Sequence, residues 1–267
     1  MRTDAMTRPR TPGSMLVPAL LLAAASACTS APEPPPMPAE LRVFSSNGVR
    51  SVIQDLQPEI ERAVDRRLSI EFSTAATLKR KIDGGEAFDA AILTPVLIDD
   101  LVAQGKVAAD SRTELARVGV GVGVREDAPP ADIGTPEALK ATLLGARSVA
   151  FGAEGQSRAT IDRAFDRLGI ADTMRQKSVL TGAGEAPVAV AAGEVDLVLT
   201  LMSEILAAPG VRPLGPFPAE LQGYISFTAG RSSNTGDADG ATALLRHLSG
   251  PAVAAAMKRH GLDPVGD

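Results

Sequence analysis

The 267-residue sequence is poor in aromatic side chains and has no extended basic segment. It contains no Trp and a single Tyr, Tyr224, so a pocket that stacks a sugar or a base between aromatic rings is not expected. The net charge is −5 at pH 7, whereas a nucleic-acid partner would require a basic stripe with stacking aromatics. The composition therefore argues against a nucleic-acid-binding protein.

Histidine and cysteine are equally scarce. His247 and His260 lie close to the C-terminus, and Cys28 is the only cysteine. The sequence has no H-E-x-x-H, G-x-S-x-G or Cys–His arrangement, and a zinc site would lack ligands. We therefore expect a protein that is not an enzyme and that holds neither a metal nor another cofactor.

Glycine is concentrated in one segment, 115–124 (LARVGVGVGV), where it alternates with valine. A dinucleotide-binding loop would instead show G-x-G-x-x-G at the start of a helix. Here an acidic and proline-containing stretch follows. The segment is predicted to be a strand that leaves the first part of the molecule and passes between two lobes.

The N-terminal segment carries the pattern of an export signal. Three arginines precede a short apolar run at 15–25. This run is shorter than the roughly 20 residues that span a bilayer, and it is typical of a secretory signal. We predict a signal peptide over 1–27 and, over 28–39, a proline-rich, semi-rigid tether.

Cys28 directly follows the small residues that end the signal segment. Bacterial lipoproteins carry their lipid on a cysteine at this place, which predicts a membrane anchor at Cys28. The alternative is a signal that is cut near a chance cysteine. Both interpretations place the protein in the periplasm or the cell envelope.

Short apolar strands, small polar turns and helices alternate along the rest of the chain. Strands are predicted at 41–44, 68–72, 88–93, 147–151, 178–180 and 195–201. This alternation predicts an α/β fold with mostly parallel sheets and flanking helices. Pro58 falls inside the helix predicted at 49–67 and is expected to kink or split it.

The polar turns are the candidate binding residues, because ligands of open α/β sheets lie beyond the carboxyl ends of the strands. Helix capping is the alternative role for such residues. Arg158 is suited to a ligand carboxylate, or else it lies at the surface or pairs with Glu154. The candidates are Ser45, Ser46, Asn47, Ser73, Thr74, Ala75, Thr94, Ser157, Arg158, Ala183 and Gly184.

Several segments, taken in order, resemble the periplasmic molybdate-binding receptors of ABC transporters, which are type II solute-binding proteins. They are 43–48 (VFSSNG), 72–78 (FSTAATL), 82–89 (IDGGEAFD), 192–196 (AGEVD) and the tail at 248–262. The resemblance extends from about residue 41 to residue 264.

The resemblance implies a two-lobed fold whose lobes are joined by crossing strands and close on the ligand. It implies a first lobe of residues 40–117 and 225–267 and a second lobe of residues 118–224. In the molybdate receptors, hydroxyls and backbone N–H groups hold the oxyanion. Three of the family's hydroxyl positions fall on Gly48, Ala75 and Leu201, which leaves the ligand open between a molybdate-like oxyanion and a small organic anion.

The expected function is capture of this small anionic solute for an ABC importer, with the membrane permease as partner. The alternative is an envelope lipoprotein that uses the same scaffold for interaction or signalling without transport. The sign of this alternative would be a cleft filled by the chain's own side chains, especially around Leu201 and Phe151.

Overall fold

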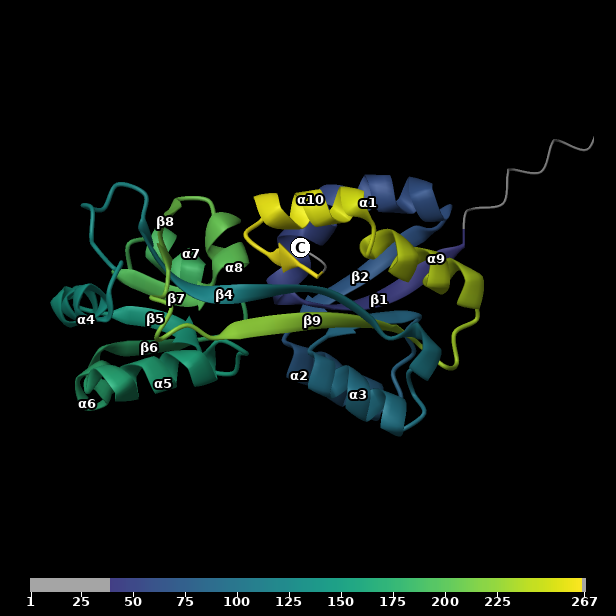
Figure 1. Ribbon diagram of the computed structural model, residues 1–267, viewed down its shortest axis with the longest axis horizontal. Helices are drawn as coiled ribbons and strands as arrows, with labels where there is room; N and C mark the ends of the chain where they lie inside the picture. Colours follow the sequence, from purple (N-terminus) through teal and green to yellow (C-terminus); the bar gives the residue numbers. More distant parts are fainter. Residues whose placement is uncertain (1–38, 266–267) are drawn as a thin grey trace, which may run out of the picture. The chain divides into compact units, whose positions relative to one another are not determined.

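The computed structural model describes residues 39–265. The predicted signal peptide, Cys28 and the proline-rich segment up to residue 38 lie outside the described residues. Within residues 39–265, no helix is both long and apolar enough to cross a membrane. The described chain is an α/β structure built on two groups of strands, which we call the first and the second lobe (Figure 1).

The first lobe is a sheet with the strand order β2-β1-β3-β9-β4. Strands β1, β2 and β3 are parallel, and β9 is antiparallel to both of its neighbours. Helices α1, α9 and α10 pack on one face, and α2 and α3 lie on the other (Figure 1). The bounds are β1 Glu40–Ser46, β2 Arg67–Ser73, β3 Ala90–Leu93, β4 Thr113–Arg125, β9 Tyr224–Arg231, α1 Arg50–Val64, α2 Ala75–Asp83, α3 Pro95–Ala103, α9 Ala238–Leu248 and α10 Pro251–Arg259.

The second lobe continues from the far end of β4 with the order β4-β7-β5-β6, and β8 also pairs with β4. Strands β5, β6 and β7 are parallel to one another. Apolar residues of α4, α5 and α6 join the main core, whereas α7 and α8 pack on a smaller cluster around Val198. The bounds are β5 Val149–Gly152, β6 Ser178–Thr181, β7 Leu197–Leu201, β8 Val211–Pro216, α4 Pro136–Gly145, α5 Arg158–Leu168, α6 Ala171–Lys177, α7 Ala186–Ala191 and α8 Met202–Leu206.

Three short elements complete the described chain. Two are 3-10 helices, η1 at Asn47–Val49 and η2 at Ala109–Ser111. The third is β10, Asp263–Pro264, which pairs with β4 near the end of the chain. Of these, η1 matters most for the site, because it carries the chain from the end of β1 into α1.

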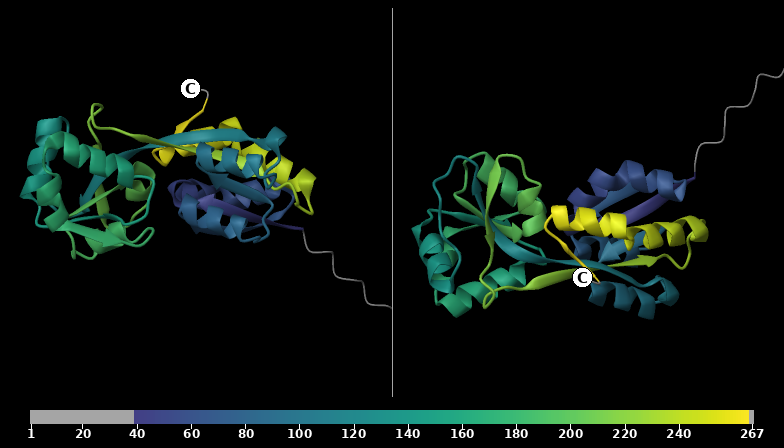
Figure 2. Two further views of the ribbon diagram at one scale, coloured as in Figure 1. Left: turned by 90° about the horizontal axis from the view of Figure 1, so that it is seen from below. Right: turned by 45° about the horizontal axis from the view of Figure 1, so that its top comes forward.

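Strand β4 belongs to both lobes. It pairs with β9 over residues 113–119 and with β7 over residues 120–124. Figure 2 shows β4 and β9 running together from one lobe to the other. The prediction that segment 115–124 is a strand between two lobes is therefore confirmed.

Close packing explains the glycines of β4. A Cβ atom at Gly121 would collide with the Met202 sulfur and would lie 2.7 Å from the Gly215 carbonyl oxygen. A Cβ atom at Gly123 would lie 2.8 to 3.0 Å from the side chains of Val211, Val198 and Ile205. These glycines therefore let β8 and α8 approach the crossing strand, and they do not form a phosphate loop.

The predicted split of the first long helix is wrong. Helix α1 runs without interruption from Arg50 to Val64 with Pro58 inside it. Pro58 is on the exposed face, while Leu56 and Ile60 are buried in the main core. Packing of this apolar face maintains the helix despite the hydrogen bond that proline removes.

Candidate functional site

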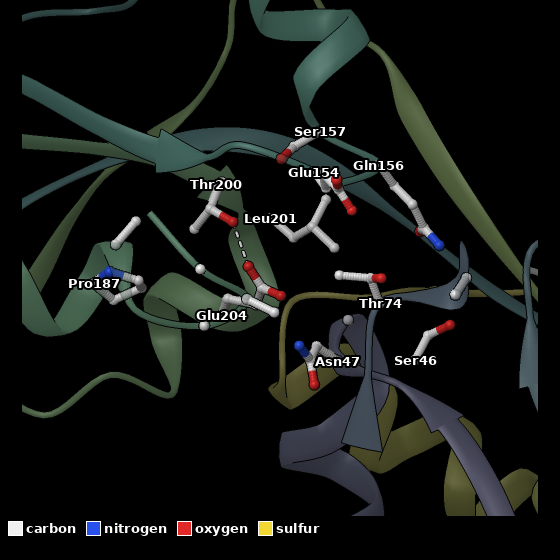
Figure 3. A pocket seen from close by; sticks show the side chains of 18 residues that line it. Ser46, Asn47, Thr74, Glu154, Gln156, Ser157, Pro187, Thr200, Leu201 and Glu204 are labelled. Carbon is white, nitrogen blue, oxygen red and sulfur yellow. Dashed lines mark hydrogen bonds between the residues drawn. The ribbon is translucent and has the colours of Figure 1, made fainter. Parts of the chain in front are cut away.

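A cleft lies between the two lobes, at the carboxyl ends of strands from both (Figure 3). The first lobe contributes the end of β1, η1 and the start of α2. The second lobe contributes the loop after β5, the turn before α7, and the junction of β7 with α8. This is the place at which open α/β sheets bind ligands.

The cleft brings together most of the residues that the sequence singles out. Ser45, Ser73, Thr94 and Arg158 are the predicted residues that do not line it. The predicted residues that do line it are Ser46, Asn47, Gly48, Thr74, Ala75, Ser157, Ala183, Gly184 and Leu201.

The predicted residues outside the cleft have other surroundings. Ser45 is buried within β1, and Ser73 is the last residue of β2. Thr94 precedes α3 and borders a separate pocket beside the cleft. The Nε of Arg158 donates to both carboxylate oxygens of Asp162, at 2.8 and 2.9 Å, so a local ion pair already occupies this guanidinium group.

Polar groups of the first lobe lie where helices begin. Thr74 caps α2, because its hydroxyl accepts a hydrogen bond from the Thr77 amide at 3.2 Å. The Asn47 side-chain oxygen accepts from the Arg50 guanidinium at 2.9 Å. Ser46 is 2% exposed, and its hydroxyl has no hydrogen-bond partner among the described residues. A buried hydroxyl without a partner costs free energy, which marks Ser46 as a candidate ligand contact.

Packing accounts for the absence of a hydroxyl at Gly48. A Cβ atom there would collide with the Phe227 ring and would lie 2.8 Å from Cδ1 of Leu201. Phe227 and Leu201 thus fill the space that a side chain at position 48 would need. Ala75 is likewise buried, against the apolar cluster that contains Phe44 and Leu78.

The second lobe places a carboxylic acid in the cleft. Glu204 is half-buried in the first turn of α8 and accepts a hydrogen bond from the Thr200 hydroxyl (Figure 3). Burial raises the pKa of the Glu204 carboxyl above its usual range, while the Thr200 hydrogen bond and the charge of Arg50 act in the lowering direction. The protonated form of Glu204 is therefore favoured more than that of an ordinary glutamate.

A neighbouring groove continues the cleft between α1, α7 and α8. Asn47, Gly184, Pro187 and Glu204 line both. The groove also contains Arg50, whereas no Lys, Arg or His is among the cleft-lining residues of the described chain. A ligand that extends from the cleft into the groove would approach this guanidinium group.

Sequence reasoning missed Thr200, Glu204 and Gln156 as cleft residues. A signal for Glu204 existed, because it follows a buried strand by three residues and lies in the next helical turn. The rule that ligands lie beyond the carboxyl ends of strands selected the turns after β1 and β2, and it applies equally to the end of β7. Gln156 belongs to the loop between β5 and α5, and its side chain carries no pattern that would have marked it.

Three comparisons bear on this site. The family model described as bacterial extracellular solute-binding protein matches residues 41–263. A relative from Pseudomonas sp named aconitate isomerase is 30% identical over 231 residues, which cover 84% of this chain and 88% of the relative.

Solved structures share the fold at low sequence identity. The periplasmic molybdate-binding protein of Azotobacter vinelandii is 17% identical with a TM-score of 0.69, and the match covers 83% of this chain and 98% of that chain. PEB3, which is known from Campylobacter jejuni, has been solved with bound L-phospholactate. That structure is 14% identical with a TM-score of 0.62, and the match covers 84% of this chain and 99% of that chain.

The resemblance to molybdate-binding receptors and the two-lobed α/β fold are therefore confirmed. Extracellular binding proteins make up the matched family, which places the described chain outside the cytoplasm. The chain belongs to the bacterial extracellular solute-binding proteins and has the fold of their molybdate-binding-like, type II members.

Proposed function

We propose that this protein captures a small organic anion in the cleft between its two lobes. The observation that carries the proposal is the buried, unpartnered hydroxyl of Ser46, which lines the cleft beside the start of α2. The first amides of a helix have no partner within the helix, and they carry partial positive charge. Such groups bind anions without a formal cation.

An organic acid fits this cleft better than a molybdate-like oxyanion does. Gly48, Ala75 and Leu201 offer no hydroxyl, and packing by Phe227 prevents a side chain at position 48. The adjoining groove places Arg50 beyond the cleft, where a second acidic group of an elongated ligand would meet it. The relative named for aconitate and the related fold with bound L-phospholactate support the same ligand class.

The proposed role is delivery of the solute to an ABC importer, with the membrane permease as partner. A signal peptide over residues 1–27 and a lipid on Cys28, followed by the proline-rich tether, would hold the receptor at the membrane. We also propose residues 40–117 with 225–267 as the first lobe and residues 118–224 as the second, which close on the ligand about β4 and β9.

Ligand-induced thermal stabilisation tests the proposal. The mature chain is heated with molybdate, tungstate, sulfate, phosphate, citrate, cis-aconitate and trans-aconitate in turn. A ligand at 100 times its Kd stabilises the folded state by about 2.7 kcal/mol. We expect the largest shift with a carboxylate, and the absence of a shift with every carboxylate would contradict the proposal.

A pair of glutamine variants tests whether the ligand that stabilises the protein binds in the cleft. Gln156 lines the cleft, and none of the hydrogen bonds found in the described chain involves its amide, whereas Gln176 is exposed on α6. We expect Gln156→Ala to weaken carboxylate binding several-fold, because one polar contact contributes about 0.5–1.5 kcal/mol. Gln176→Ala should bind like the wild type, and equal loss in both variants would place the ligand elsewhere.

An interaction role without transport is less well supported. Leu201 fills part of the cleft beside Gly48, but Phe151 is buried in the core, where its ring contacts the ring of Phe165. Phe151 therefore does not fill the cleft, which polar residues of both lobes line. Failure of all seven compounds to stabilise the protein would favour the interaction role.

A second candidate function is isomerisation of an unsaturated carboxylic acid. The relative named aconitate isomerase favours it, together with Glu204, a carboxyl of raised pKa in the cleft. A group that takes a proton from a bound substrate and returns it works best with a pKa near the working pH. Chromatography of cis-aconitate incubated with the protein tests this function, and the absence of the trans isomer with the wild type would exclude it.

A further inference from the structure

The charges that line the cleft have one sign. Glu154 and Glu204 are its charged lining residues within the described chain. Glu154 is exposed, and its Oε2 lies 3.9 Å from Nη2 of Arg80 of the first lobe, so water and this cation screen its charge. Glu204 is the half-buried carboxyl, and an anion in the cleft would meet it directly.

The charged groups nearest to Glu204 on α1 and before α7 have other hydrogen-bond partners. Arg50 from α1 donates to Asn47 Oδ1 and stacks over Phe72, with its Cζ 5.0 Å from the ring centroid. Glu185, from the turn before α7, is bonded to the Gly182 amide at 2.8 Å. Among the residues that the structure describes, no ion pair to Glu204 is found, and Arg50 is the cation that lines the groove.

The hydrogen bond from Thr200 leaves the second oxygen of Glu204 available. The Thr200 hydroxyl donates to Oε2 (Figure 3), and the Glu204 side chain lines both the cleft and the groove. An ionised carboxylate only accepts hydrogen bonds, whereas a protonated one also donates. A protonated Glu204 would offer its O–H to an anionic oxygen at the place where an ionised Glu204 repels it.

We infer that Glu204 determines ligand specificity by binding in its protonated form, so that the cleft takes up an organic anion together with one proton. This inference rests on the proposed function. The O–H of Glu204 donates to a carboxylate oxygen of the ligand, and the Thr200 hydroxyl bonds the other oxygen of Glu204. Burial favours the same protonated form in the free protein.

Calorimetric titration with trans-aconitate and with sulfate tests the inference between pH 5.5 and 8.5. Sulfate is included because it does not titrate in this range. Above the pKa of the free Glu204, we expect the wild-type affinity to fall about tenfold for each pH unit. Titrations at a single pH above the pKa of Glu204 in the unbound protein, in two buffers of different ionisation enthalpy, should show uptake of about one proton.

Glu204→Gln is the decisive variant, because its amide donates a hydrogen bond but does not titrate. We expect its affinity for either probe to be independent of pH apart from the ligand's own titration, with no proton uptake. Glu137→Gln, at an exposed carboxylate in the first turn of α4 that does not line the cleft, should keep the wild-type pH dependence. Thr200→Val removes the hydrogen bond that favours the ionised form, so it should extend tight binding to higher pH.

Two outcomes would overturn the inference. Equal pH dependence and equal proton uptake in the wild type and Glu204→Gln would exclude the protonated donor while leaving anion capture intact. Absence of binding by both proteins to all seven compounds of the thermal panel at every pH would remove the proposed function and this inference with it. Thr200→Val retains Glu204 and so tests the inference even where Glu204→Gln does not fold.

Discussion

The close approach of β8 and α8 to β4 depends on Gly121. Met202 and the Gly215 carbonyl occupy the volume that a side chain would need. Gly145, the last residue of α4, is a suitable control because a Cβ atom there would have no neighbour within 4 Å.

We expect Gly121→Ala to destabilise the protein by about 1–3 kcal/mol, because overpacking forces neighbouring atoms to shift. Gly145→Ala should be neutral or stabilising by up to about 1 kcal/mol. Urea unfolding measures both values. Equal stability of the two variants would show that the β4 glycines have no packing role.

Glu204 also gives the fold a pH dependence. In the unfolded chain a glutamate ionises near its ordinary pKa of about 4.3, whereas burial raises the pKa in the folded protein. Stability is therefore lost as the pH rises from the ordinary pKa through the folded one. We expect the stability gain of Glu204→Gln over the wild type to be larger at pH 8 than at pH 4, measured by urea unfolding.

Glu61 is a control, because its contribution to stability should change with pH in the opposite direction. The Gln57 side chain and the Leu68 amide donate to its carboxylate and lower its pKa. Its stabilising effect is present above the ordinary pKa and is lost as the pH falls. Glu61→Gln should therefore cost more stability at pH 7 than at pH 3, and the same pH trend in both variants would contradict the assignment of Glu204.

The start of α9 is fixed by the side chain of Asp237, which caps the helix. Asp237 precedes α9, and its Oδ1 accepts a hydrogen bond from the Gly240 amide at 2.9 Å. The second oxygen pairs with Arg66, at the turn between α1 and β2. One carboxylate thus caps α9 and joins it to the end of the neighbouring helix α1, and the Arg66 hydrogen bond lowers the pKa of Asp237.

We expect Asp237→Ala to cost about 1–2 kcal/mol at pH 7, because it removes a cap and a partly exposed ion pair. Asp237→Asn keeps a capping acceptor and should lose less. The cost of Asp237→Ala should shrink as the pH falls from the ordinary aspartate pKa of about 3.9 through the lower pKa of the folded protein. Thermal unfolding at pH 7 and pH 3 measures these differences.

Strands and helices were predictable where short-range pattern decides them. The apolar strands at 68–72 and 195–201 and the small polar turn that follows the first of them are local signals, and β2 and β7 occur there. β1 extends to Ser46, beyond the predicted 41–44, because its ladder with β2 continues to the Ser46–Ser73 pair. Such an extension depends on a partner strand, which a single sequence segment does not reveal.

The site was predictable only in part for the same reason. The rule for strand ends found the turns after β1 and β2, and Ser46 and Thr74 do line the cleft. It could not separate Ser46 from Ser45, because sheet alternation and packing decide which side chain reaches the cleft. Glu204 acquires its chemistry from burial between α1, α7 and α8, which is a tertiary effect.

A hydrogen bond across the cleft connects the lobes of the described chain. The Ser203 hydroxyl of α8 donates to the Gly48 carbonyl of the first lobe at 2.7 Å, and both residues are buried. Gln222 instead holds β4 within the second lobe, because its side-chain oxygen accepts from the Val120 amide and its side-chain nitrogen donates to the Val120 carbonyl, each at 2.9 Å.

We expect Ser203→Ala to destabilise the protein by about 1 kcal/mol and to speed amide hydrogen exchange at residues 47–49. Loss of this bond leaves the Gly48 carbonyl without its side-chain donor and loosens the contact between α8 and η1. Ser249→Ala, at the C-terminal cap of α9, is the control. Unchanged exchange at residues 47–49 in Ser203→Ala would show that this bond does not connect the lobes.

The pairing of β3 with β9 affects the order in which the chain completes its structure. Synthesis proceeds from the N-terminus, yet β3 of the first lobe pairs with β9, which ends at residue 231. The strands and helices before residue 104 therefore remain an unfinished sheet until more than a hundred further residues have emerged. Contacts of such long sequence separation form slowly, so the sheet of the first lobe is completed only after most of the chain has been synthesised.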